Sequence, residues 1–184
     1  MKQHIYTADE ALFLAPDLLG GKAANLAWMT REAIPVPRWW VVTTSAFTQL
    51  LADNGLRDFI ESALVNFQSN EDLSALEPIA AEIRQRVLTA KTPHSLKVEL
   101  ADYFGQRQNQ YFAVRSSILG EDAQGASFAG QMDSYLFQRG LTAIEESLLQ
   151  VCASAFNTRA LHYRLSKSIA LSDIRAAVII QEMV

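Results

Sequence analysis

Glycine is scarce in this chain, and its positions constrain the fold more than any other feature of the sequence. The 184 residues include 8 glycines and 5 prolines, fewer than the roughly 7% and 5% of average proteins. Five of the eight glycines lie in two places, Gly20-Gly21 and the set Gly120, Gly125 and Gly130. Since glycine permits tight turns and a close approach of the backbone to a ligand, we predict mostly regular structure interrupted by two unusual loops.

Apolar residues at helical spacing fill most of residues 1–110. The clearest case is 74–90, where Ser74 and Glu77 have the spacing of a capping box and an apolar stripe follows. One aromatic and β-branched stretch, 38–44, predicts a buried strand instead. The remaining helices are predicted over 22–34, 46–53 (capped by Ser45), 56–67 and 93–107.

The second part of the chain, 111–184, alternates between strands and helices in the order strand-loop-strand-helix-helix-strand. Strands are predicted over 111–115, 133–138 and 175–184, helices over 141–156 and after Asn157, and a loop with glycines and serines over 116–130. These elements predict an α+β fold, in which a helical part over 1–110 precedes a small mixed or antiparallel sheet with flanking helices. Because natural domains rarely end within a strand, we expect the chain to be part of a longer domain.

Charge and cysteine content exclude several classes of protein. With 16 Lys and Arg against 20 Asp and Glu, the net charge is −4, which argues against nucleic acid or an anionic membrane as a partner. The N-terminus lacks the apolar core of a signal peptide, and no apolar run approaches the roughly 20 residues of a membrane span. The single cysteine, Cys152, cannot form an internal disulfide, so we expect a cytoplasmic protein.

The spacing of the reactive residues indicates neither a metal centre nor a nucleophilic triad. Cys152 falls on the apolar face of a predicted helix, which is typical of a core residue. His4, His94 and His162 lie far apart in the sequence, and no cluster of His, Cys and Asp has metal-ligand spacing. We therefore predict no metal ligands in this chain, and we interpret the histidines as surface or helix residues.

Two glycines and a lysine open the first predicted helix. Gly20-Gly21 lets the backbone approach a ligand, and the helix N-terminus offers free N–H groups and a partial positive charge. Lys22 adds a full positive charge, although a cation at this end is unfavourable for the helix itself. The segment is not a Walker A loop, because Pro16 stands where the first glycine belongs and Ala23 follows the lysine. The alternative interpretation is a flexible loop with a solvated lysine.

The most informative segment is Val114 to Gln131, which reads Val-Arg-Ser-Ser-Ile-Leu-Gly-Glu-Asp-Ala-Gln-Gly-Ala-Ser-Phe-Ala-Gly-Gln. A strand delivers Arg115 to its end beside two serines, and a guanidinium can bind a phosphate through two parallel hydrogen bonds. The loop that follows would present the backbone N–H groups of 127–130 to a chain of phosphates. The alternative interpretation is a structural ion pair between Arg115 and Glu121 or Asp122.

This segment closely resembles the N-terminal nucleotide-binding domain of the phosphoenolpyruvate synthase and pyruvate phosphate dikinase family, whose relatives include rifampicin phosphotransferases and glucan water dikinases. The resemblance extends over nearly the whole chain, from Gly20-Gly21-Lys22 to Gln181-Glu182-Met183-Val184, in order and at matching spacing. One departure is Trp39-Trp40, where relatives often have Gly-Phe, and we expect it to alter the packing of that strand.

The resemblance implies an ATP-grasp fold, of which residues 1–184 form the first lobe. It also implies that Lys22 and Arg115 contact the phosphates of ATP, and that Gly130 and Ser134 belong to a loop that covers them. A connector beneath the adenine is implied for Gln181, Glu182, Met183 and Val184. Mg2+ ligands are expected in the second lobe, which this chain lacks together with a phosphohistidine domain and an acceptor domain.

Two functions agree with these observations. In the first, the chain is the ATP-binding fragment of a kinase-type transferase, inactive alone, whose parent moves a phosphoryl group from ATP to a histidine and then to pyruvate or another acceptor. In the second, it is a natural short protein that kept this lobe as a non-catalytic module for binding anions or proteins. We expect an uncovered apolar patch or sheet edge, which favours self-association.

Overall fold

The computed structural model describes residues 3–65, 67, 73–118, 122–123, 126–127, 132–167, 169 and 174–184. Five strands form one sheet in which every neighbouring pair is antiparallel. In sheet order they are β1 (Ile5–Thr7), β2 (Trp39–Val42), β7 (Ala176–Glu182), β3 (Tyr111–Ile118) and β6 (Ser134–Arg139). A separate pair is formed by β4 (Asp122–Ala123) and β5 (Ala126–Ser127). The predicted combination of helices with a small antiparallel sheet is confirmed.

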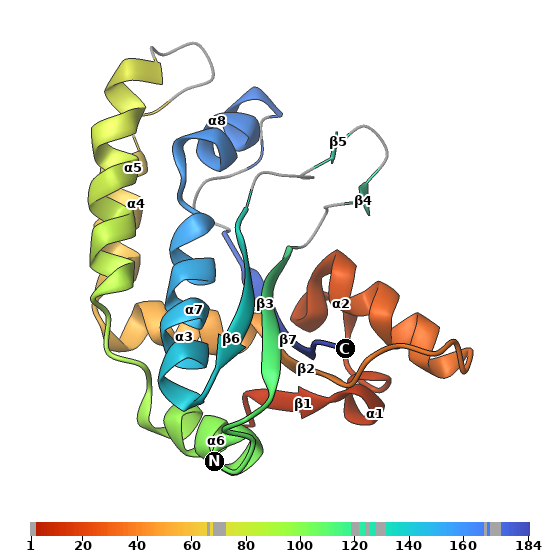
Figure 1. The fold of residues 1–184 in the computed structure, drawn as a ribbon. Helices are drawn as coiled ribbons and strands as arrows, with labels where there is room; N and C mark the ends of the chain where they lie inside the picture. The colour runs from red at the N-terminus through yellow and green to blue at the C-terminus, as the bar shows by residue number, and fades with distance from the viewer. Residues whose placement is uncertain are drawn as a thin grey trace.

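Helices lie between β1 and β2, between β2 and β3, and between β6 and β7 (Figure 1). Before β3 these are α1 (Ala8–Ala11), α2 (Pro16–Arg31), α3 (Thr44–Asp53), α4 (Leu56–Leu64), α5 (Leu73–Leu88) and α6 (His94–Phe104), and between β6 and β7 they are α7 (Leu141–Ser154) and α8 (Thr158–Ser166). Asn157 caps α8 as predicted, because its Oδ1 accepts the N–H of Ala160 at 2.7 Å. Within the described ranges, no helix combines the length and the apolar character that crossing a membrane requires.

Several boundaries differ from the sequence prediction. β1 is absent from the prediction because a three-residue strand is too short to display an alternating pattern. β3 runs on to Ile118 instead of ending at Arg115, since its last residues pair with β7. α3 begins at Thr44, so Thr43 and not Ser45 is its cap residue. α5 begins at Leu73, so Ser74 lies inside the first turn and not before it.

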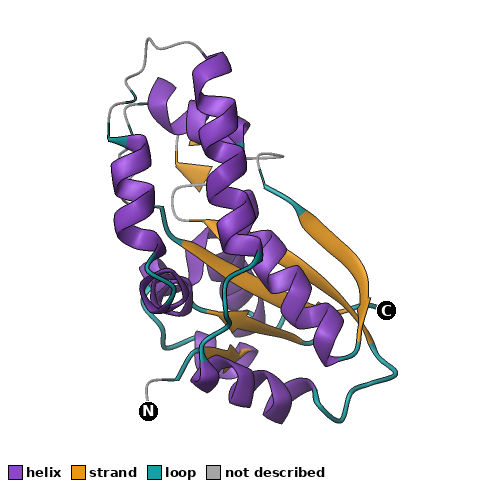
Figure 2. Ribbon diagram, turned by 90° about the vertical axis from the view of Figure 1, so that its left-hand side faces the viewer, coloured by secondary structure: helices purple, strands orange, loops and turns teal. Residues whose placement is uncertain are grey.

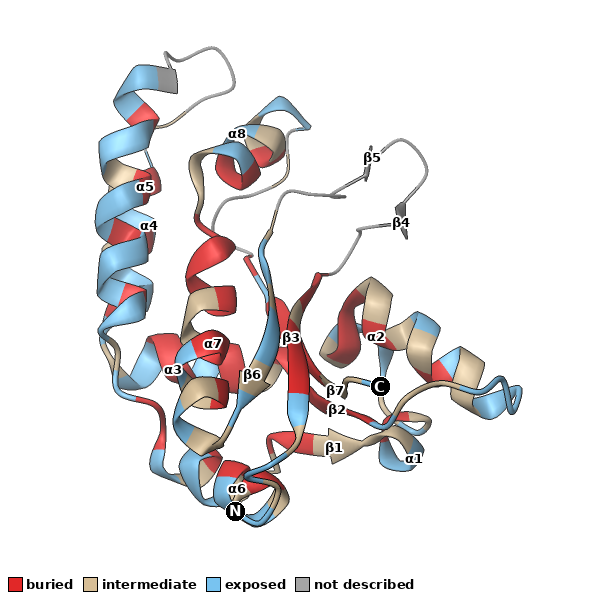
Figure 3. Ribbon diagram, viewed as in Figure 1, coloured by how far each residue is buried: buried red, intermediate tan, exposed pale blue. Residues whose placement is uncertain are grey.

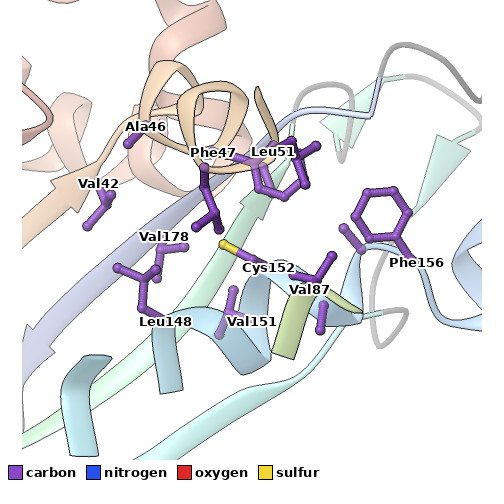
Figure 4. Close-up of a cluster of buried hydrophobic side chains, with 14 of the residues drawn as sticks. Val42, Ala46, Phe47, Leu51, Val87, Leu148, Val151, Cys152, Phe156 and Val178 are labelled. Atoms are coloured by element: carbon purple, nitrogen blue, oxygen red, sulfur yellow. The ribbon is translucent and has the colours of Figure 1, made fainter. Parts of the chain in front are cut away.

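The larger core lies between one face of the sheet and helices α3 to α8, which cover that face in Figure 2. In it, Trp40, Phe104 and Phe112 meet edge to face, with ring centroids 5.1 to 6.2 Å apart. Cys152 of α7 is buried beside Leu148 (Figure 4), which confirms its interpretation as a core residue. His4, which directly precedes β1, is also buried, so its interpretation as a surface or helix residue was wrong.

A smaller core lies between the opposite face of the sheet and helices α1 and α2. Because successive residues of a strand point to opposite faces, Trp39 enters this core while Trp40 enters the larger one. Burial is concentrated on the sheet and on the helix sides that face it (Figure 3). On the α2 face the side chains toward β6 are less covered, since Arg115 is half-buried and Ser134 is exposed. Two of the predicted site residues, Arg115 and Ser134, lie on this partly open face.

Candidate functional site

Helix α2 is broken near its start, at the glycine pair that the sequence singled out. Gly20 has φ +71° and ψ 172°, so a second helical segment begins at Gly21. A Cβ on Gly20 would lie 2.4 Å from the carbonyl oxygen of Ser117. Because that contact would be a clash, the position requires a glycine. The N–H of Ala23 donates to Ser117 Oγ at 2.9 Å. Gly20 therefore allows a close approach to strand β3, and the approach of Gly20-Gly21 to a ligand stays a prediction.

Arg115 and Ser134 lie opposite each other on neighbouring strands. Arg115 of β3 pairs with Ser134 of β6 on one side and with Ile179 of β7 on the other. Directly opposed residues of antiparallel strands project from the same face, with Cβ atoms roughly 5 Å apart. Ser117, two residues beyond Arg115, shares that face and holds the start of the second segment of α2. The structure therefore places the arginine, two serines and a helix start together.

Lys22 belongs to the first turn of that second helical segment. It is half-buried and directly precedes Ala23, the residue that is hydrogen-bonded to β3. Its predicted position at a helix start is correct, although the helical turn Pro16–Leu19 precedes the break. Lys22, next to the residue that is hydrogen-bonded to Ser117, and Arg115, two residues before Ser117 on β3, thus belong to segments that meet at the same strand although they are 93 residues apart in sequence (115 − 22). Two cations and serine hydroxyls at such a place can bind a polyanion.

Two residues of the predicted connector, Gln181 and Glu182, belong to β7 and point to opposite faces of the sheet, while Met183 and Val184 follow the end of the strand. Gln181 pairs with Ala113 of β3 and with Trp39 of β2, so it shares the face of Arg115. Glu182 is turned to the opposite face, where its Oε1 lies 3.7 Å from Nη1 of Arg107. Sequence reasoning carried no signal for this contact, because it joins residues 75 positions apart (182 − 107).

Backbone groups of the connector are partly engaged within the sheet. The N–H of Glu182 donates to the carbonyl of Arg38 at 2.8 Å, and the N–H of Met183 donates to the carbonyl of Tyr111 at 2.9 Å. Neither N–H can therefore also read the edge of a base in this conformation. The backbone groups of this segment that remain available to contact a base are its carbonyl groups and those of the exposed Val184.

An irregular stretch of β6 lies beside the connector and was missed by the sequence analysis. Between two regular β3–β6 pairs, Ala113 faces both Leu136 and Phe137, and Phe137 has φ +58°, which is rare for an aromatic residue. The N–H of Phe137 donates to Sδ of Met183 at 3.1 Å. Three consecutive apolar residues, Tyr135 to Phe137, break the alternation of a regular strand and are the signal that could have revealed this bulge.

Two of the predicted site features lie outside the part of the chain that the structure describes. Gly130, assigned to the phosphate-covering loop, and Glu121, an alternative ion-pair partner of Arg115, lie outside the described residues. Among the described residues, no group of three or more His, Cys, Asp and Glu side chains is arranged to hold a metal ion.

Next to Ser134, burial raises the pKa of the Tyr135 hydroxyl, and the nearby Asp133 carboxylate raises it further. Tyr135 is therefore protonated at neutral pH.

Comparison with known proteins agrees with the resemblance. The family described as "Pyruvate phosphate dikinase, AMP/ATP-binding domain" matches residues 16–184. A probable phosphoenolpyruvate synthase of Methanothermobacter thermautotrophicus is 33% identical over 91% of this chain and 25% of its own length. A phosphoenolpyruvate synthase of Neisseria meningitidis is 35% identical over 90% of this chain and 22% of its own length. A rifampicin phosphotransferase of Streptomyces sviceus is 36% identical over 91% of this chain and 19% of its own length. The chain thus spans a quarter or less of these curated relatives.

Proposed function

This chain belongs to the pyruvate phosphate dikinase AMP/ATP-binding domain family, and we propose that it is the first lobe of an ATP-grasp site in a larger, cytoplasmic phosphotransferase. The observation that supports the proposal is that Arg115 and Ser134 are paired on a partly open sheet face, and that Lys22 belongs to the helical turn that is hydrogen-bonded to the same strand. The names of the relatives, which are phosphoenolpyruvate synthases and a rifampicin phosphotransferase, support a kinase-type parent.

The proposed roles follow from the charge and position of each residue. Lys22 and Arg115 hold the phosphates of ATP, because phosphoryl transfer needs mainly positioning and positive charge around the developing anion. Ser134 and the loop that contains Gly130 cover the same phosphates. The adenine is bound beside the connector, which comprises Gln181, Glu182, Met183 and Val184.

The rest of the reaction is assigned to parts of the parent protein outside this chain. The parent transfers a phosphoryl group from ATP to a histidine and then to pyruvate or another acceptor. On the family resemblance, we assign the Mg2+ ligands to a second lobe. The acceptor histidine and the acceptor pocket are assigned to further domains, since the chain spans a quarter or less of its relatives.

The test is substitution of both cations in the full-length protein that contains this chain. We expect Lys22→Ala and Arg115→Ala each to lower turnover at least about tenfold, which corresponds to a loss of roughly 1.4 kcal/mol of transition-state stabilisation. Arg86→Ala, which removes an exposed arginine of α5, is the control and is expected to leave turnover unchanged. Near wild-type rates for both site variants would refute the phosphate-binding roles. ATP binding without any turnover in the wild-type parent would instead favour the non-catalytic module.

A further inference from the structure

We propose that Arg107 is a positioning residue that holds the base-binding connector, Gln181–Val184, in its orientation. The proposal rests on the proposed function, because it assumes that a nucleotide base is bound beside this segment. Arg107 follows α6 and belongs to none of the motifs that the sequence singled out. Its part is inferred from three sets of contacts, which tie its own backbone, its guanidinium and the backbone of Glu182.

Arg107 is itself held firmly at the end of α6. Its backbone N–H donates to the carbonyl of Phe104 at 3.0 Å, and its Nε donates to the carbonyl of Tyr103 at 2.9 Å. The guanidinium carbon lies 5.2 Å from the centre of the Trp40 ring, within the range of a cation–π contact. Trp40 in turn packs against Phe104 and Phe112. The positive charge of Arg107 therefore has a fixed position relative to the sheet.

That charge faces a carboxylate that would otherwise be isolated. Glu182 Oε1 lies 3.7 Å from Arg107 Nη1, and the two side chains are only 15% and 31% exposed. Within the described part of the chain, Oε1 is buried and has no hydrogen-bond partner. A buried carboxylate oxygen without a hydrogen bond is costly, and a nearby cation offsets that cost. The pairing of Glu182 with Phe112 places the side chain of Glu182 on the core face, and Arg107 fixes the position of its carboxylate there.

Glu182 and Gln181 point to opposite faces of the sheet. Successive residues of a strand alternate between the faces, and the pairing of Gln181 with Ala113 and Trp39 turns it to the site while Glu182 faces Arg107. The N–H groups of Glu182 and Met183 are fixed by Arg38 and Tyr111. With the backbone held on two sides and the side chain held by Arg107, the carbonyl groups of the connector have one defined direction. Base recognition by backbone groups depends on that direction.

The experiment uses the full-length protein and measures steady-state kinetics with ATP and with GTP. We expect Arg107→Gln to raise KM for ATP roughly threefold to tenfold, the range for loss of a partly buried ion pair, with kcat nearly unchanged. Preference for ATP over GTP is expected to fall, and Arg107→Lys is expected to restore part of it. Arg107 lines an open groove of about 400 Å³ together with Trp39 and Tyr103, so water can fill the space that a shorter side chain leaves.

Glu182→Gln provides a second, nearly isosteric variant, and Arg86→Gln is the matched control. Arg86 also stacks on a ring (Phe59, 3.8 Å) and pairs with a glutamate (Glu82, 2.8 Å), but it belongs to α5. We expect Glu182→Gln to act like Arg107→Gln, the double variant to add little, and Arg86→Gln to leave KM and base preference unchanged.

Unchanged KM and base preference in Arg107→Gln and Glu182→Gln would overturn the proposal, and so would a loss of thermal stability alone. If Lys22→Ala and Arg115→Ala still lower turnover in that case, the proposed function stands and only the role of Arg107 is wrong. If all four variants behave like the wild type, the proposed function fails as well.

Discussion

Gly20 determines how closely α2 approaches the sheet. Its φ of +71° and ψ of 172° belong to a region that is almost restricted to glycine, and a Cβ would lie 2.4 Å from the Ser117 carbonyl oxygen. We expect Gly20→Ala to lower the free energy of unfolding by at least about 3 kcal/mol, because backbone strain and a clash with backbone add together. The midpoint and slope of urea unfolding measure this loss.

Gly55 is the matched control for that prediction. It has φ +63°, but among the described residues no heavy atom lies within 4 Å of a Cβ built there. Gly55→Ala should therefore lower the free energy of unfolding by only about 1 kcal/mol, which is the cost of holding an alanine in the left-handed conformation. Equal losses in the two variants would mean that the contact with Ser117 is not tight, and that α2 can shift away from β3.

Cys152 links stability to alkaline pH. Burial raises the pKa of its thiol from 9.0 to about 12. Between these values the unfolded chain loses the proton and the folded chain keeps it, so the free energy of unfolding falls as the pH rises. From pH 9 to pH 10 we expect a loss of roughly 1 kcal/mol, measured by urea unfolding at each pH. Burial also raises the pKa of Tyr6, Tyr103 and Tyr135 from 10.0, so their contributions follow at higher pH.

Cys152→Ala isolates the thiol in that measurement. The variant is expected to be less stable at every pH, since a core side chain is shortened, but its stability should vary less between pH 9 and pH 10. An equally steep decline in the variant would assign the alkaline loss to other groups.

Strand β1 depends on a carboxylate of a distant helix. Glu99 of α6 accepts the N–H of His4 at 3.0 and 3.1 Å and the N–H of Ile5 at 2.7 Å. In Glu99→Gln one acceptor oxygen becomes a donor that faces an N–H, so we expect β1 to lose about 1–3 kcal/mol of local stability. Hydrogen exchange at Thr43, whose N–H donates to the carbonyl of His4, reports the opening.

Glu82→Gln is the corresponding control for β1, since it changes an exposed carboxylate that pairs with Arg86. An exposed pair contributes little, so exchange at Thr43 should stay as in the wild type. If Glu99→Gln also leaves that exchange unchanged, β1 is held by its pairing with β2 and by its side chains alone.

Elements with a pattern of their own were predictable, and elements held by distant residues were not. α7 and α8 have apolar spacing, α8 also has the Asn157 cap, and both helices were predicted closely. β1 was missed because its hydrogen bonds come from β2 and Glu99, and the extension of β3 was missed because it needs β7. The same division holds at the site. Motifs predicted Lys22 and Arg115 as neighbours of one ligand, whereas the turn of Glu182 toward Arg107 depends on a contact between segments that no local pattern contains.

The two faces of the sheet are covered unequally, and this affects the whole molecule. Helices α3 to α8 cover one face and bury the larger core, whereas in the described part of the chain the helices that pack on the other face are α1 and α2. At the edge of the sheet, β6 exposes Leu136 and Phe137. Exposed apolar residues on an edge strand favour pairing with another chain, so self-association of this chain alone stays a prediction, which sedimentation at several concentrations would test.

The partly open face also bears on how tightly this chain alone is expected to hold a nucleotide. In the proposed function the chain supplies two cations and the connector, while it spans only 19% to 25% of the relatives compared above. Each charge-assisted hydrogen bond that a second lobe would add contributes roughly 1.5–3 kcal/mol, so the absence of even one weakens binding at least about tenfold. We therefore expect the isolated chain to bind ATP weakly and to hydrolyse none. The full-length parent, by contrast, is expected to bind ATP tightly and to consume it. Calorimetric titration in the presence and absence of Mg2+ provides the measurement, and micromolar, Mg2+-dependent binding by the isolated chain would contradict the assignment of half the site to another lobe.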